Sequence, residues 1–551
     1  MKQKWMLVSL ITLFIFLTAL LIGCQQQNLK MAATTLLVVL QSSEREMKPP
    51  PLSTDARGND GEQNLNTLEY MPVWEETRCL YRPERTESFE CGYVMVPENR
   101  RLSSSEEQTF IRLYVTVIHS RNQNAQPDPV IYLSGGPGGR TFPFIRSISR
   151  RFDEILEERD LILFDQRGIH LSEPNLDCPE ILDWKMATLD QSLARNEVVS
   201  GNIKANLSCL DRLNKSDIDV SAYTSAASAL DIDDIRQALG YEQVNLYGVS
   251  YGSRLALTAM RDLEETGTIR SVILDSVYSP PEDLFIGLSP NAERVFSLLF
   301  QRCADDIGCN TAYPNLEITY YDLVAQLSTQ PKLIEVAGRA SDDGPFTMLL
   351  DGDDTIRLLF NMMYDTNTIP KLPQLITEMA SGKYDNPDLQ RWLRWLIISA
   401  EFFSEGMWYS VMCGEEAHFG NESLVRAGAG DAHPAIQAYF IDLAMTIDYA
   451  TCDVWGAHPA DAVENEVVVS SIPTLVLAGE FDPITPPAWS QRAANPLSHV
   501  YYLEFPDVGH GVLIARQCAR DITADFVAQP NHQPNIDCMS DLPPLQFVLP
   551  E

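Results

Sequence analysis

The stretch NLYGVSYGSRLAL, Asn245–Leu257, decides the fold. It opens with the end of a short apolar run typical of a buried strand and closes with a helix-like pattern. Between the two, Gly248, Ser250 and Gly252 have the G-x-S-x-G spacing of a nucleophile elbow. We expect a sharp turn that lifts the Ser250 hydroxyl out of a sheet, because glycine has no side chain to collide with the neighbouring strand and helix. The N–H of Tyr251 would then point to the place where an oxyanion forms.

A serine hydroxyl is a poor nucleophile without a base, and the chain supplies one later. His510 lies in FPDVGHG, where flanking glycines let a loop carry the imidazole toward Ser250. Asp482 follows the apolar run TLVLAGEF and precedes PITPP, which predicts a loop after a strand. In chains with such an elbow, the catalytic residues follow one another in the order Ser, acid, His. We therefore predict that Asp482 orients His510, which takes the proton of Ser250. Glu480 and Asp507 are the alternative acids.

A second glycine-rich stretch, SGGPGG at Ser134–Gly139, follows another buried-strand run. Only glycine lets backbone N–H groups approach a reacting carbonyl so closely, so we expect the second oxyanion donor here. Gly136 is the first choice and Gly135 the next. A phosphate-binding loop is the alternative, but no Lys-Ser/Thr follows the glycines. No CxxC pair or HExxH stands out, so we expect neither a metal site nor a cofactor.

Apolar runs alternate with helix-like stretches up to about residue 281 and again after about residue 468. This alternation predicts an α/β fold, a mostly parallel sheet with helices on both faces. The segment between these two parts is rich in aromatic residues and mostly helical in pattern, which predicts a large helical cap insertion. The expected organisation is an export signal at 1–23, a tether at 24–70, core at 71–281, the cap at 282–468 and further core at 469–551.

Composition and the N-terminus indicate an exported protein with an acidic surface. The 551 residues are 45% hydrophobic and carry a formal net charge of -35, which suits a globular chain and excludes nucleic acid as a partner. Lys2 and Lys4 precede an apolar run that ends in LIGC at Cys24. That pattern describes an export signal and is similar to a bacterial lipobox, in which Cys24 would be lipidated. We expect a bacterial cell-envelope location with a lipid anchor in a membrane; an uncleaved membrane anchor is the alternative.

Ten cysteines remain when Cys24 is set aside. An even number in an exported chain favours disulfides. Pairing along the chain would join Cys79 to Cys91, Cys178 to Cys209, Cys303 to Cys309, Cys413 to Cys452 and Cys518 to Cys538. The sequence alone leaves this connectivity open.

The chain resembles the α/β-hydrolase serine peptidases of the prolyl aminopeptidase family, in particular their secreted tripeptidyl-aminopeptidase-like branch with its characteristic C-terminal region. The resemblance rests on CGYVMVPENR, GGPGG, DQRG, the elbow, GEFDPITP, GHG and the region of the last two cysteines. It implies peptide substrates with a free N-terminus. Ser134 and His170 depart from the usual pattern beside the expected cleft, so the detailed substrate preference does not follow from the family.

Cleavage next to a free N-terminus requires a group that binds the α-ammonium. VMCGEEAHF places Glu415 and Glu416 in the predicted cap, and the family has acidic residues at the matching stretch. We predict that these two carboxylates bind the substrate; the alternative is that both are solvated surface residues. Two further acidic clusters, Asp231–Asp234 and Asp351–Asp354, are interpreted as helix starts.

The sequence therefore predicts a serine exopeptidase of the aminopeptidase type, prolyl or tripeptidyl, working through an acyl-enzyme on Ser250. An esterase or lipase with the same triad is an alternative, since both reactions pass through the same tetrahedral oxyanion. A non-catalytic envelope binding protein is a third interpretation, which the intact triad disfavours.

Overall fold

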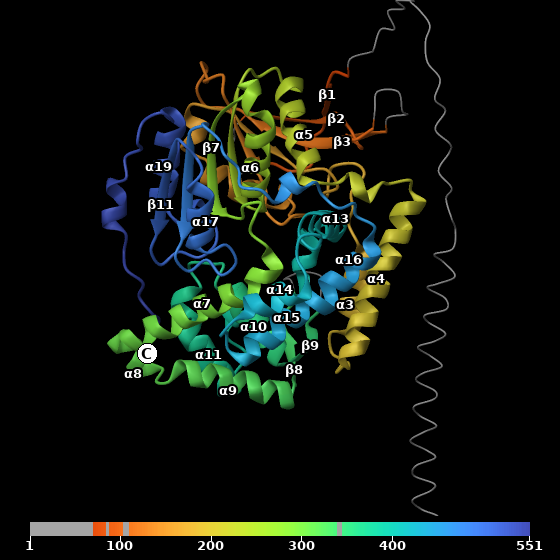
Figure 1. Ribbon diagram of the computed structural model, residues 1–551. Helices are drawn as coiled ribbons and strands as arrows, with labels where there is room; N and C mark the ends of the chain where they lie inside the picture. The colour runs from red at the N-terminus through yellow and green to blue at the C-terminus, as the bar shows by residue number, and fades with distance from the viewer. Residues whose placement is uncertain (1–69, 84–87, 103–108, 339–343, 551) are drawn as a thin grey trace, which may run out of the picture. The chain divides into compact units, whose positions relative to one another are not determined.

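The computed structural model describes residues 70–83, 88–102, 109–338 and 344–550. The predicted export signal, almost all of the tether and Cys24 lie outside these residues. The described part contains a nine-stranded sheet in the order β1-β2-β3-β5-β4-β6-β7-β10-β11 (Figure 1). Its strands are β1 Trp74–Thr77, β2 Phe89–Pro97, β3 Phe110–Ile118, β4 Val130–Leu133, β5 Leu161–Phe164, β6 Val244–Ser250, β7 Ile269–Val277, β10 Thr474–Gly479 and β11 Val500–Phe505.

The six strands from β5 to β11 in this order pair in parallel, and β1, β2 and β3 extend one edge with antiparallel pairs. β10 is buried along its whole length, and β6 is buried up to its last residue. Continuous apolar runs are typical of parallel strands covered on both faces, which is why VNLYGV and TLVLAG form central strands. The predicted mostly parallel sheet is confirmed.

Helices cover both faces of the sheet. Residues of α5 (Ser225–Ala238), α6 (Tyr251–Leu263) and α17 (Pro487–Ala494) pack with the sheet in one buried cluster. Residues of α2 (Ile145–Arg151) and α19 (Gln517–Ala528) pack with it in another, together with the short α18 (Val512–Ala515). The sheet is thus sandwiched between two helical layers, as predicted.

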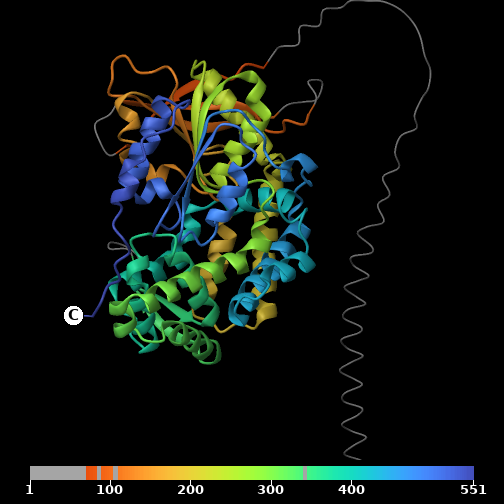
Figure 2. The ribbon, with the colours of Figure 1, turned by 60° about the vertical axis from the view of Figure 1, so that its left-hand side comes forward.

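A separate helical layer, the cap, lies beyond one end of the sheet (Figures 1 and 2). Most of it comes from the chain between β7 and β10, and it also contains a two-stranded sheet. Two helices from an earlier part of the chain pack into the same buried cluster. The cap elements are α3 Pro179–Thr188, α4 Arg195–Lys215, α7 Leu284–Asp305, α8 Ile307–Ala312, α9 Leu316–Thr329, β8 Lys332–Val336, β9 Phe346–Leu350, α10 Gly352–Met362, α11 Leu372–Ala380, α12 Pro387–Ile398, α13 Glu405–Glu415, α14 Glu422–Ala429, α15 Pro434–Leu443 and α16 Ala450–Trp455.

Five disulfides join the described cysteines in the pairs predicted from their order along the chain. Cys413–Cys452 ties α13 to α16 within the cap, and Cys178–Cys209 ties α3 to α4. In the described part of the chain every helix is too short or too polar to cross a bilayer.

The two acidic clusters have different outcomes. Asp351 caps α10, as predicted, by accepting a hydrogen bond from the N–H of Asp354 at 2.8 Å. The interpretation of Asp231–Asp234 as a helix start is wrong, because α5 already begins at Ser225. Asp231 is buried in the middle of this helix, where Arg100 and Arg167 donate hydrogen bonds to its carboxylate. Arg100 of PENR and Arg167 of DQRG therefore bind the same helix, α5, and hold it to the sheet.

Candidate active site

Ser250 lies at the sharp turn between β6 and α6. Its backbone has φ 58° and ψ -127°, a strained conformation for a residue with a side chain. A Cβ on Gly248 would lie under 3.0 Å from the carbonyl of Gly252, and one on Gly252 under 3.0 Å from the carbonyl of Leu133. Both glycines are thus required by close backbone contacts, and the turn is the elbow that the sequence predicts.

His510 and Asp482 are in direct contact. His510 Nδ1 donates to Asp482 Oδ2 at 2.8 Å. The same carboxylate accepts hydrogen bonds from the N–H of Ile484 at 3.0 Å and of Thr485 at 2.9 Å, and from the Thr485 hydroxyl at 2.9 Å. Asp482 is completely buried, so water does not compete for it. These contacts fix the proton of His510 on Nδ1 and leave Nε2 free to act as a base.

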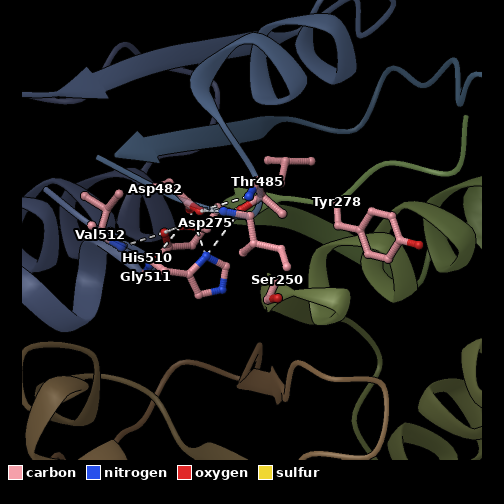
Figure 3. Close-up of polar contacts among 12 residues, drawn as sticks. Ser250, Asp275, Tyr278, Asp482, Thr485, His510, Gly511 and Val512 are labelled. Carbon is pink, nitrogen blue, oxygen red and sulfur yellow. Dashed lines mark hydrogen bonds and ion pairs between the residues drawn. The ribbon is translucent and has the colours of Figure 1, made fainter. Parts of the chain in front are cut away.

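The loop that carries His510 is clamped by the end of β7. Asp275 accepts hydrogen bonds from the N–H groups of Val512 at 2.8 Å and Leu513 at 2.9 Å, and Ser276 Oγ accepts one from Gly511 N at 2.8 Å. Figure 3 shows these contacts beside the imidazole. The loop behind the base is therefore fixed by the strand next to the one that carries the nucleophile.

The electrostatics of the pair suit a base held by a carboxylate. Burial acts to lower the pKa of His510, but the Asp482 carboxylate outweighs it, so the pKa is raised above its ordinary value. Burial acts to raise the pKa of Asp482, but His510 and the N–H groups around the carboxylate hold it below its usual range. Asp482 stays ionised and favours the imidazolium form of His510.

In Figure 3, Ser250 lies on the side of the imidazole that carries the free ring nitrogen. No hydrogen bond joins the two side chains in this structure. Such bonds are often long in enzymes without substrate and shorten when the substrate binds. Glu480 instead pairs with Arg302, and Asp507 accepts from the N–H of Leu545, so neither alternative acid contacts His510.

The glycine loop after β4 borders the nucleophile. A Cβ on Gly135 would lie 2.9 Å from Ser250 Cβ and 3.4 Å from its Oγ, so this loop passes directly beside the hydroxyl. Gly136 follows with φ 126°, a conformation that favours glycine. Tyr251 is the first residue of α6, where the N–H has no partner within the helix. The N–H groups of Tyr251 and Gly136 remain the predicted oxyanion donors.

A cavity of about 760 Å³ opens beside this loop. Its wall combines the glycine loop with residues of α2 and α18 on the core side and with aromatic residues of the cap. The cap touches the loop directly, because Ser404 N donates to Gly138 O at 2.8 Å. The cavity wall includes Tyr132, Ile148, Arg151, Lys185, Glu405 and Ile514.

Glu415 and Glu416, the predicted substrate-binding residues, do not reach this cavity. Both are almost fully buried at the end of α13. Glu415 accepts from the N–H and the hydroxyl of Ser225, each at 2.6 Å. Glu416 accepts from Arg254 at 2.5 Å and from the N–H of Leu284 at 2.9 Å. The carboxylate oxygens of both residues accept hydrogen bonds from the protein itself. We therefore correct the prediction that they bind the α-ammonium directly and assign them a structural role.

This buried cluster connects the cap to the elbow. Ser225 Oγ lies 2.8 Å from the hydroxyl of Tyr251, the residue after the nucleophile. Arg254, on α6, is the single cation facing both glutamates among the described residues. Burial raises the pKa of Glu416 to about 7 despite this arginine. Glu415 and Glu416 therefore hold α13 against the helix that begins at the nucleophile.

Sequence reasoning missed two residues that shape the site. Thr485 binds Asp482 through both its N–H and its hydroxyl, and Asp-Pro-x-Thr is a turn pattern that could have indicated this. Asp275 directly follows the apolar run VIL in β7, and a carboxylate is rarely buried in such a strand without a partner.

A family model described as the α/β hydrolase fold matches residues 128–516, which include the elbow, the glycine loop, Asp482 and His510. The chain belongs to the α/β-hydrolase fold family. Its fold is that of an α/β hydrolase.

Three curated relatives of this α/β hydrolase are similar at low identity. A putative hydrolase YuaR of Escherichia coli is 22% identical over 473 residues, covering 81% of this chain and 87% of the relative. A tripeptidyl aminopeptidase of Streptomyces coelicolor is 27% identical over 38% of each chain. The serine protease Hip1 of Mycobacterium bovis is 24% identical over 46% of this chain and 49% of the relative. The chain thus spans less than half the length of the two relatives named as peptidases.

Proposed function

We propose that this protein is a serine exopeptidase that cleaves peptide bonds near free N-termini. The observation that carries the proposal is the ordered Asp482–His510 pair next to the strained Ser250, beside a glycine loop and a cap-covered cavity. His510 takes the Ser250 proton as Oγ attacks the peptide carbonyl, and the oxyanion accepts hydrogen bonds from Tyr251 and Gly136. His510 then protonates the leaving amine, and water hydrolyses the acyl-enzyme. The names of two relatives, a tripeptidyl aminopeptidase and a serine protease, support this choice.

Glu405 is the residue that we propose for binding the α-ammonium, in place of Glu415 and Glu416. It begins α13 and is the only acidic side chain in the cavity wall among the described residues. Burial raises the pKa of Glu405 to about 7, and the neighbouring Lys185 acts against this rise. A substrate ammonium would favour the ionised carboxylate further, so that binding and ionisation support each other.

A substrate panel tests the proposal. Purified protein receives fluorogenic amino acid, dipeptide, tripeptide and ester substrates, with Ser250→Ala as the inactive control and a fluorophosphonate probe to label Ser250. We expect release from peptides with a free N-terminus and much slower release from N-acetylated ones. Equal rates on free and blocked peptides would refute the aminopeptidase assignment, and cleavage of esters alone would favour an esterase.

Glu405→Gln tests the ammonium site separately. The variant is expected to raise KM for free peptides about tenfold, the size of one hydrogen bond to a charged group, and to leave the slow cleavage of acetylated peptides unchanged. Asp448→Asn is the matched control, since Asp448 is a buried acid beside Lys185 that does not line the cavity. A KM that rises equally for free and acetylated peptides would contradict the role of Glu405.

We also propose that the protein is exported to the bacterial cell envelope and anchored through a lipid on Cys24. The five disulfides support an oxidising compartment. Incorporation of labelled fatty acid into the wild type, and its loss in Cys24→Ser, is the expected result; labelling of the variant would refute the anchor.

A further inference from the structure

One corner of the cavity beside the glycine loop is formed by the core rather than by the cap. We call it the α2–α18 corner and define it by Tyr132, Ile148, Arg151 and Ile514, all of which line the cavity. Ile148 and Arg151 belong to α2, Ile514 to α18 and Tyr132 to β4. The buried cluster on this face of the sheet includes Ile148 and contacts Tyr132, so the corner lies against the sheet beside the glycine loop.

Two hydrogen-bond donors in this corner lack a partner among the residues that the structure describes. Within the described part of the chain, neither the Arg151 guanidinium nor the Tyr132 hydroxyl forms a hydrogen bond or an ion pair with another residue. Burial lowers the pKa of the Arg151 guanidinium, while the nearby Tyr132 and Tyr247 act to raise it. A guanidinium without an acid is unusual in the wall of a cavity in a chain with a net charge of -35.

The α2–α18 corner adjoins the loop that carries His510, because Ile514 follows the base by four positions. α18 begins two residues after His510, and His510 is the residue that delivers a proton to the departing amine. Glu405 and the aromatic residues of the cap line the cavity from another element, α13 and its surroundings. If the N-terminus of a peptide binds at Glu405, the residues after the cleaved bond would therefore occupy the α2–α18 corner.

We propose that Arg151, assisted by the Tyr132 hydroxyl, binds a carboxylate in the departing portion of the substrate. A guanidinium presents parallel N–H donors that match the two oxygens of a carboxylate, and a phenol adds a third donor. The carboxylate is either an acidic side chain next to the cleaved bond or the free C-terminus of a short peptide. This inference rests on the proposed peptidase function and adds a substrate preference to it.

Three peptides separate the two sources of the carboxylate. They share the N-terminal portion that the wild type releases fastest and differ only in the residue after the cleaved bond, which is Glu amide, Gln amide or Gln with a free carboxylate. Cleavage is followed by chromatography, and kcat and KM are measured for the wild type, Arg151→Met, Arg151→Lys and Arg146→Met. Arg146 is the matched control, because it is an exposed arginine of the same helix that does not line the cavity.

The wild type is expected to cleave at least one carboxylate peptide with a kcat/KM about tenfold or more above that of the Gln amide peptide, mainly through a lower KM. Arg151→Met should abolish this advantage and leave the Gln amide peptide within about twofold of wild type. Arg151→Lys should retain part of the advantage and Arg146→Met all of it. Equal kcat/KM for all three peptides in the wild type, or an advantage that survives in Arg151→Met, would overturn the inference alone. Failure of the wild type to cleave any peptide would instead refute the peptidase function.

Discussion

Replacing Asp482 by Asn tests the assignment of the catalytic acid, because the change conserves size and removes charge. The Asp482 carboxylate accepts hydrogen bonds from His510, from Ile484 and twice from Thr485. An amide has one accepting oxygen, so it cannot satisfy all these donors. If its NH₂ group faces His510, it favours the tautomer that carries the proton on Nε2, the atom that must be free to act as a base.

The expected loss follows from the burial of this pair. Asp482 is completely buried, and the His510 side chain is only 11% exposed, so water cannot replace the carboxylate. The corresponding change in a serine protease triad lowers kcat about 10⁴-fold. We therefore expect kcat/KM of Asp482→Asn to fall about 10³- to 10⁴-fold, which corresponds to roughly 4–5.5 kcal/mol of transition-state stabilisation.

The assay compares kcat/KM of Asp482→Asn with Glu480→Gln and Asp507→Asn, the two acids that the sequence also offered. Thermal unfolding of each variant shows whether the fold is intact. Glu480 contacts Arg302 and the N–H of Asp507 rather than His510, so Glu480→Gln is expected to stay within about tenfold of wild type. A folded Asp482→Asn enzyme that keeps more than about a tenth of the activity, or a control that loses as much, would refute the assignment.

Three further results are expected. The pKa of His510 is raised, and its neutral form is the base, so kcat/KM should fall as pH decreases through a value above the ordinary 6.5 or so; a pH profile with a lower midpoint would contradict this. Gly252→Ala should lower the melting temperature and abolish labelling by fluorophosphonate, because its Cβ would overlap a backbone carbonyl; a stable, fully labelled variant would contradict the elbow geometry. Glu415→Gln should lower the free energy of unfolding by about 1–3 kcal/mol without changing the ratio of KM for free and acetylated peptides. A changed ratio would show that Glu415 does bind the substrate.

The sequence was sufficient to predict the parts of the site that follow from a local motif or from a recognisable strand. The elbow could be predicted because Gly248, Ser250 and Gly252 have the G-x-S-x-G spacing between a strand-like and a helix-like stretch, although the close contact of Gly252 with Leu133 comes from a distant strand. Asp482 and His510 could be predicted because each follows a recognisable strand, β10 in the buried part of the sheet and β11 at its edge, and parallel strands bring their ends to the same edge of a sheet. Pairing the cysteines in their order along the chain gave the observed disulfides, although the sequence alone left other connectivities open.

The sequence was insufficient where a carboxylate depends on partners from distant segments. Glu415 and Glu416 look like free acids in VMCGEEAHF, but Arg254, some 160 positions earlier, makes them buried structural groups. Asp231 was misinterpreted for the same reason, since Arg100 and Arg167 come from other parts of the chain. A helix pattern indicates which face is buried, but it does not show which cation from a distant segment packs against that face.

Arg151 shows where a stronger inference from the sequence is possible. The helix IRSISRR contains three arginines, and only one of them lines the cavity. Arg151 follows the buried Ile148 by three positions, a spacing that places both on the same face of a helix. Arg146 and Arg150 are four positions apart on the exposed face. Arg151 is partly buried in the cavity wall and forms no ion pair with another described residue, so its charge is open to a ligand. The helical register therefore distinguishes Arg151 from the other two arginines as the residue that we propose for a substrate carboxylate.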